Sequence, residues 1–161
     1  MLNENKSVLM KLRLEQANKC LESALLLSNA SAYKDSANRS YYAIFHAMRA
    51  VLALDCFDSK KHSGIISEFR RRYIKNGIFP KKFSDIIEDA FDVRTDSDYN
   101  DFYVISKDDV MSQIENAKTF LAAVEDFIES KKSEQQISDL DTETEQHIEK
   151  ENNRLCRRFL V

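Results

Sequence analysis

Glycine and proline are almost absent from this chain, which has 161 residues but only two glycines and one proline. The chain reversals of sheets and barrels depend on glycine, proline and asparagine at special backbone dihedrals. So few of these residues argue against an all-β fold and against a collagen-like fold. With 43% hydrophobic and 32% charged residues, the chain can build one packed core with a well-solvated surface, and its length predicts one domain.

Long apolar runs and paired cysteines are also missing. No run of 18 apolar residues occurs, so we expect no transmembrane helix, and charges interrupt the N-terminal segment too often for a signal peptide. The three cysteines, Cys20, Cys56 and Cys156, are widely separated, which argues against a disulfide framework or a zinc knuckle. We therefore expect a protein of the reducing cytoplasm that makes no contact with a membrane.

The apolar residues that are present recur at the spacing of helices. In the first segment, Leu9, Leu12 and Leu21 belong to such a repeat. A fourth segment starts near Pro80, and residues 95–105 resemble a loop because Asp and Asn crowd them. The first three expected helices span 6–30, 32–55 and 61–76, and a fifth follows residue 106.

Several residues have the chemistry of helix ends. Gly77 follows the third helix, where a left-handed residue is often needed, and either Asp58 or Ser59 is expected to cap its start. Ser106 and Asp109 have the spacing of a capping box. These signals predict an all-α fold, an up-and-down bundle of four to five helices joined by short connections.

The C-terminal segment has a different character. Residues 133–153 hold seven acidic side chains against one Lys150, with too few aliphatic residues to order independently. We predict a helical domain over 1–131 and an acidic tail over 132–161, either mobile or a marginal helix. The basic and apolar residues at the very end are expected to be ragged, the alternative being that they dock on a partner or on the domain.

Two groups with complementary chemistry share one face of the second helix. Arg39 and His46 are seven residues apart, about 10 Å along a helix axis, and Tyr42 lies between them. Alanines, including Ala43 and Ala50, interleave with these polar residues, while large apolar side chains occupy the other face. The polar face is either an exposed surface or a cleft or subunit seam that carries polar chemistry.

Arginine and histidine together suit the cleavage of a phosphodiester. A guanidinium grips phosphate oxygens in pairs, and an imidazole exchanges protons near neutral pH. No two histidines have a metal-ligand spacing, and no glycine-rich phosphate loop occurs, so we expect no metal and no cofactor. The hypothesis is RNA cleavage to a 2′,3′-cyclic phosphate, with Arg39 on the phosphate and His46 as acid or base. Two such helices paired across a two-fold axis would supply both proton-transfer groups.

Charge is segregated along the middle of the chain. Residues 60–82 hold eight basic side chains against one acidic side chain, and residues 83–101 hold seven acidic against one basic. Two interpretations stay open. Either the basic segment follows a phosphate backbone, or the two segments neutralise each other across an antiparallel helix pair.

Three stretches together resemble a known family. Residues 38–52, NRSYYAIFHAMRAVL, are similar to the signature helix of HEPN domains. Residues 61–66, KHSGII, and 94–99, RTDSDY, are similar to further landmarks of one prokaryotic branch. The resemblance covers about residues 5–130.

This resemblance implies a helical bundle that forms a homodimer through the signature helix. It also implies metal-independent ribonuclease activity, often as the toxin encoded beside a minimal nucleotidyltransferase antitoxin. Arg39 and His46 match the paired catalytic residues of the family. The sequence departs from the pattern twice: Ser40 stands where active toxins carry Asn, Asp or His, and Met48 where members silenced by nucleotide transfer carry Tyr.

The resulting prediction is an RNA endonuclease, and the alternative is a non-catalytic module that binds a nucleotide or a nucleotidyltransferase. The expected catalytic residues are Arg39 and His46. Further contacts to RNA or nucleotide are expected from Asn38, Tyr42, Lys61 and His62. Tyr42 could equally pack at the seam, and His62 could equally begin the third helix. Asp98 and Tyr99 are expected to anchor their loop and to hold Arg39 or Arg94 in place.

Overall fold

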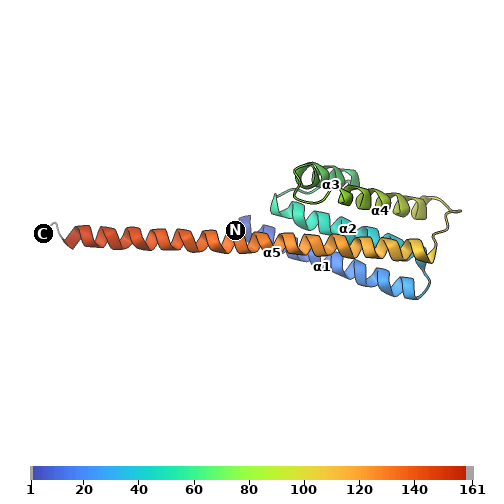
Figure 1. Ribbon diagram of the computed structural model, residues 1–161, viewed down its shortest axis with the longest axis horizontal. Coiled ribbons are helices and arrows are strands. Elements are labelled where there is room, and N and C mark those ends of the chain that lie inside the picture. The colour runs from blue at the N-terminus through green and yellow to red at the C-terminus, as the bar shows by residue number, and fades with distance from the viewer. Residues whose placement is uncertain (1, 159–161) are drawn as a thin grey trace. The chain divides into compact units, whose positions relative to one another are not determined.

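The computed structural model describes residues 2–158, and all of its regular elements in that range are helical (Figure 1). This confirms the predicted all-α fold. In chain order the elements are α1 (Leu2–Asn29), α2 (Tyr33–Leu54), α3 (His62–Phe69), the π-helical turn η1 (Arg70–Ile74), α4 (Lys82–Tyr99) and α5 (Lys107–Arg158).

The chain divides into two compact units, residues 1–124 and 125–161. In the first unit, α1 runs along α2 in the opposite direction, and the two helices pack extensively against each other (Figure 1). Helices α3 and α4 also contact α2, on the side away from α1. Helix α2 is therefore the central element of this unit.

Helix α2 is buried on most of its circumference. The apolar face expected from its sequence is fully buried, with Tyr41, Ile44 and Met48 among the largest core side chains. Ala43 and Ala50, which the sequence places on the polar face, are both buried within the single chain, so this part of the face is not an exposed surface. Such small side chains allow a neighbouring helix to approach α2 closely. Only a narrow polar strip of α2 stays partly exposed.

The buried side of α1 differs from the expected stripe. Leu9 and Leu12 are 41% and 57% exposed, while Met10 and Arg13 are buried. The stripe that is buried has the same helical period as the expected one but includes the charged Arg13. A search for apolar periodicity alone therefore missed it. Burial of a guanidinium is tolerable only when it is paired, and Arg13 has an aspartate partner described below.

The helix ends confirm part of the sequence analysis. Gly77 has the left-handed φ of 74° expected after the third helix. The capping box forms, since the Asp109 amide donates to Ser106 Oγ at 3.1 Å and Ser106 Oγ donates to the Asp109 carboxylate at 2.5 Å. The expected loop over 95–105 was partly wrong: α4 continues to Tyr99, with Thr95 Oγ1 donating to the Phe91 carbonyl at 2.8 Å.

The C-terminal segment is helical as far as it is described. Helix α5 continues to Arg158, and every side chain from 131 to 148 is exposed. Of the two expectations for the tail, mobile or helical, the structure shows the helix. The last three residues of the expected ragged end, 159–161, lie outside the described residues, and the domain boundary at residue 131 stays a prediction.

The capping box gives the first prediction. Changing Ser106 to Ala removes the oxygen that accepts the Asp109 amide, so the free energy of unfolding should fall by about 1 kcal/mol. Urea denaturation followed by circular dichroism measures the change. Ser112→Ala is the matched control, because Ser112 is an exposed interior position of the same helix, where Ala is favoured. Equal losses in both variants would contradict the capping role.

Deleting residues 132–161 tests the predicted domain boundary at residue 131. Because the described side chains from 132 to 148 are all exposed, the deletion removes none of the buried side chains found in this range. We expect the melting temperature of the shortened chain to stay within roughly 2 °C of the parent, measured by calorimetry. A drop of several degrees would show instead that the end of the chain docks on the domain.

Candidate functional site

The predicted catalytic pair lies on the partly exposed strip of α2. The Arg39 guanidinium carbon lies 4.9 Å from the centre of the Tyr42 ring, and that ring lies 6.1 Å from the His46 ring. Tyr42 therefore sits between the two groups and contacts both. The helix period explains this order, since residues 39, 42 and 46 follow one another on a single face.

A chain of polar contacts orients Arg39. Its Nη2 donates to Asn38 Oδ1 at 2.8 Å, and Asn38 Nδ2 donates to Asp98 Oδ1 at 3.2 Å. Asp98 also pairs with Arg94 at 3.0 Å, and the Arg94 guanidinium lies 5.9 Å from the centre of the Tyr99 ring. Asp98 and Tyr99 thus hold Arg94 as expected. Asn38, predicted to bind substrate, connects Arg39 to the end of α4.

His62 is tied into the aromatic cluster beside the strip. It begins α3, its Nδ1 lies 2.6 Å from the Tyr41 hydroxyl, and its ring stacks on Phe45 at 4.2 Å. Burial raises the pKa of Tyr41, so its hydroxyl stays protonated, and the tautomer of His62 determines which of the two groups donates. Burial also lowers the pKa of His62, which favours the neutral ring. The His62 ring is 5.8 Å from that of Tyr42, so the structure brings this residue to the edge of the site.

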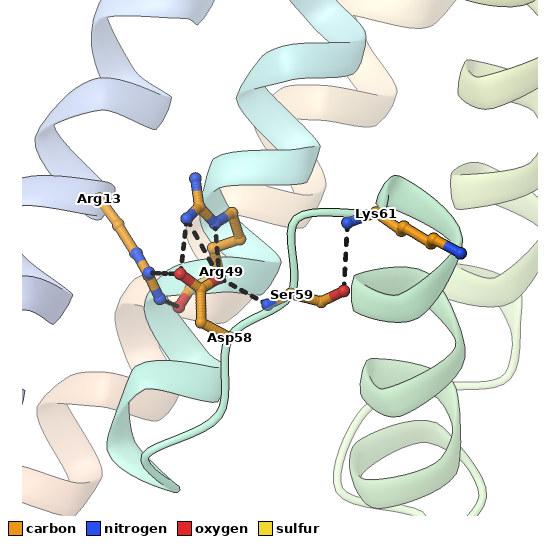
Figure 2. A network of polar contacts seen from close by, with 5 residues as sticks. All are labelled: Arg13, Arg49, Asp58, Ser59 and Lys61. Carbon is orange, nitrogen blue, oxygen red and sulfur yellow. Dashed lines mark hydrogen bonds and ion pairs between the residues drawn. The ribbon is translucent and has the colours of Figure 1, made fainter.

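Lys61 is placed differently from the other predicted residues. It directly precedes α3, and its amide donates to Ser59 Oγ at 3.1 Å. Its side chain is exposed and points away from Arg13, Arg49 and Asp58 (Figure 2). The structure therefore does not gather Lys61 with Arg39 and His46 into one set of contacts.

Three charged residues that the sequence analysis did not identify as site residues meet beside the strip (Figure 2). They are Arg13, Arg49 and Asp58, and we call them the arginine clamp. Arg49 Nε and Nη2 donate to Asp58 Oδ1 at 3.2 and 3.1 Å, and Nη2 also donates to Oδ2 at 2.9 Å. Arg13 Nη2 donates to Oδ2 at 2.7 Å, and its Nη1 donates to the Arg49 carbonyl at 3.0 Å.

The clamp corrects one expectation about α3. Neither Asp58 nor Ser59 is its N-cap residue, because Lys61 occupies that position without a side-chain cap. Asp58 instead accepts from two guanidinium groups and from the Ser59 amide. For Arg49, the sequence did contain a signal that it belongs to the site, because this residue falls one helical turn after His46 on the same side of α2.

The electrostatic surroundings determine the protonation state of His46. Burial is the largest cause of a low pKa, which falls to about 4, and the positive charges of Arg49, Arg13 and Arg39 act in the same direction. The imidazole is therefore neutral at neutral pH and ready to accept a proton. A phosphate bound beside it would shift the pKa back upward.

The arginines of the basic segment form ion pairs with acidic side chains of the same chain. Arg71 and Arg72 bind Glu68 on their own helical segment, at 2.7 Å in each case. Arg70 crosses to α4, where it pairs with Glu88 at 3.4 Å and donates to a backbone carbonyl. Neutralisation between the basic and acidic segments thus occurs at Arg70 and Glu88. Binding of a phosphate backbone by the exposed lysines of this segment stays a prediction.

The described part of the chain lacks two features. Between residues 2 and 158, no three His, Cys, Asp or Glu side chains lie together where they could hold a metal ion. Within the same range, no helix has the length and apolar character needed to cross a membrane.

Comparisons with known proteins identify relatives of this chain and a structure of similar fold. A UPF0332 protein of Thermotoga maritima is 30% identical over 81% of this chain and 98% of its own length. A protein of Methanocaldococcus jannaschii named "Putative toxin MJ0142" is 29% identical over 73% of this chain and 80% of its own length. The crystal structure of TT1696 from Thermus thermophilus has a similar fold, with a TM-score of 0.63, 16% identity, and coverage of 73% of this chain and 96% of that one.

The family is shown by a match that includes both α2 and the residues around its polar strip. The sequence family described as the HEPN domain matches residues 10–127, which is most of the chain. This confirms the resemblance carried by residues 38–52, 61–66 and 94–99. The protein belongs to the HEPN domain family.

Proposed function

We propose that this protein is a metal-independent RNA endonuclease of HEPN type. The observation that carries the proposal is the placement of Arg39 and a neutral His46 on one partly exposed strip, with Tyr42 between them. A permanent cation beside a proton acceptor is what transesterification of RNA requires, since one group binds the phosphate while the other activates a hydroxyl.

The reaction follows from these two groups. His46 accepts the proton of a 2′-hydroxyl, and the 2′-oxygen attacks the adjacent phosphorus. The bond from phosphorus to the 5′-oxygen breaks, which leaves a 2′,3′-cyclic phosphate, and the leaving oxygen takes a proton. Arg39 offsets the negative charge that develops on the phosphoryl oxygens. In the proposed homodimer, the bound phosphate raises the pKa of the second copy of His46, so this copy is protonated and supplies the proton to the leaving oxygen.

The proposed biological setting is a toxin paired with a nucleotidyltransferase antitoxin. Two relatives from Methanocaldococcus jannaschii carry the name "Putative toxin", which supports the first half of this proposal. The partly exposed, cationic strip supports an anionic substrate, RNA or a nucleotide. A homodimer paired through α2 would place two such strips at one seam.

A second candidate is a non-catalytic module that binds a nucleotide or a nucleotidyltransferase. Ser40, which follows Arg39, is fully buried, and its hydroxyl donates to the Ser36 carbonyl at 3.1 Å. It therefore offers no polar group to a substrate. Met48 is also fully buried. Neither residue therefore adds to the polar chemistry of Arg39, Tyr42 and His46 on the strip.

Substitution of the pair separates the two candidates. We expect Arg39→Ala and His46→Ala each to slow cleavage of a fluorescent single-stranded RNA by about 10²–10⁴-fold, because each removes a group used in the transition state. Mass spectrometry of the products should detect the cyclic phosphate only with the parent. His147→Ala is the control, since His147 is exposed on α5.

Two outcomes would count against catalysis. If both variants cut RNA as fast as the parent, Arg39 and His46 are not the catalytic groups. If the parent cuts no RNA but binds a nucleotidyltransferase, the protein is the non-catalytic module.

The low pKa of His46 predicts the pH dependence. A base with a lowered pKa is deprotonated, and so active, from a lower pH upward. The acidic limb of the kcat/KM profile should therefore have its midpoint well below 6.5, nearer to 4. Circular dichroism at each pH verifies that the fold persists. A midpoint at 6.5 or above would contradict the assignment of His46 as the base.

A further inference from the structure

We propose that Arg49 binds a second phosphate of the RNA, next to the one cleaved, and that Asp58 occupies its guanidinium until RNA arrives. This inference rests on the proposed function. It assigns the arginine clamp to substrate binding, a role that the Arg39 and His46 pair does not require.

The position of Arg49 suits a neighbouring phosphate. Arg49 follows His46 by three residues and Arg39 by ten, which corresponds to rises of about 4.5 Å and about 15 Å along the axis of α2. His46 therefore lies between two guanidinium groups on one partly exposed strip. An RNA chain that follows this strip with its reacting phosphate at Arg39 and His46 brings another phosphate toward Arg49.

The contacts that Arg49 makes show that it is arranged for an oxyanion. Its Nε and Nη2 both donate to the Asp58 carboxylate, at 2.9 to 3.2 Å. The guanidinium fork matches carboxylate and phosphate oxygens alike. The third nitrogen of Arg49 points away from Asp58 (Figure 2). The Asp58 side chain is 47% exposed, so the Arg49–Asp58 pair lies where an incoming anion can approach it.

Arg13 lowers the energetic cost of moving Arg49 from Asp58 to a phosphate. Its side chain is only 8% exposed and is fixed by Asp58 at 2.7 Å and by the Arg49 carbonyl at 3.0 Å. When Arg49 turns toward a phosphate, Asp58 keeps this second cation, so neither the carboxylate nor the buried guanidinium is left unpaired. Two arginines sharing one aspartate also leave a net positive charge, which attracts an anion.

The inference predicts effects of opposite sign at the two partners. Losing Arg49 should weaken RNA binding, because a phosphate contact is lost. Losing the charge of Asp58 should strengthen it, because the anion that competes for Arg49 is gone. A clamp that served only to hold the loop after α2 would weaken binding in both cases.

Binding is measured in a His46→Ala background, so that no RNA is cut. The probe is a fluorescent eight-nucleotide RNA, followed by anisotropy over a range of salt concentrations. We expect Arg49→Gln to weaken its affinity about tenfold and to reduce the salt slope by about 1. Arg49→Lys should lose part of this affinity, since it keeps the charge without the fork. Asp58→Asn should bind about two- to fivefold more tightly.

The controls have the same charge changes elsewhere. Lys118 pairs with Glu115 at 2.7 Å on α5, so Lys118→Gln and Glu115→Gln should leave the affinity nearly unchanged. The dinucleoside monophosphate UpA carries a single phosphate, and NMR titration should show that Arg49→Gln binds it as the parent does. Thermal unfolding verifies that each variant is folded, and Arg49→Gln tests the inference even if Asp58→Asn unfolds.

The outcomes separate this inference from the proposed function. If the His46→Ala protein binds no RNA, the proposed function fails and the inference fails with it. If that protein binds RNA but Arg49→Gln leaves both affinity and salt slope unchanged, only the inference fails. Weaker binding by folded Asp58→Asn, or an equal loss in Lys118→Gln, would also overturn it.

Discussion

The burial of α2 is the constraint on which the rest of this structure depends. Neighbouring helices cover its large apolar side chains and its alanines alike, so polar residues can meet solvent only along one strip. Any chemistry on this helix must use side chains three or four residues apart. The order Arg39, Tyr42, His46 and Arg49 is therefore a consequence of packing as well as of function.

Several cations surround this strip, and their arrangement explains the state of its histidine. Arg13 is buried beside the strip and is paired with Asp58, while Arg39 is held by Asn38. Desolvation and these positive charges together disfavour a charged imidazole. The same groups that would attract a phosphate thus keep His46 in the form that accepts a proton.

Local patterns predicted much of this molecule. Apolar periodicity indicated the helices, and the spacing of Arg39 and His46 placed them on one face. Contacts between distant segments could not be read in this way. Arg13 was missed because Leu9 and Leu12 form an equally good stripe, and only the fold shows that Asp58 pairs with the arginine. The link from Asn38 to Asp98 joins residues 60 positions apart, which no helical period connects.

The wide turn η1 has a consequence for how the chain can change. The Lys75 amide donates to the Arg70 carbonyl five residues earlier, so the turn holds one residue more than regular helix would. Tyr73 lies within it and reaches Asp55 at the end of α2 with a hydrogen bond of 2.7 Å. Deleting one residue here would return the turn to the hydrogen-bonding pattern of a regular α-helix. The additional residue therefore determines which side chain of the turn reaches Asp55.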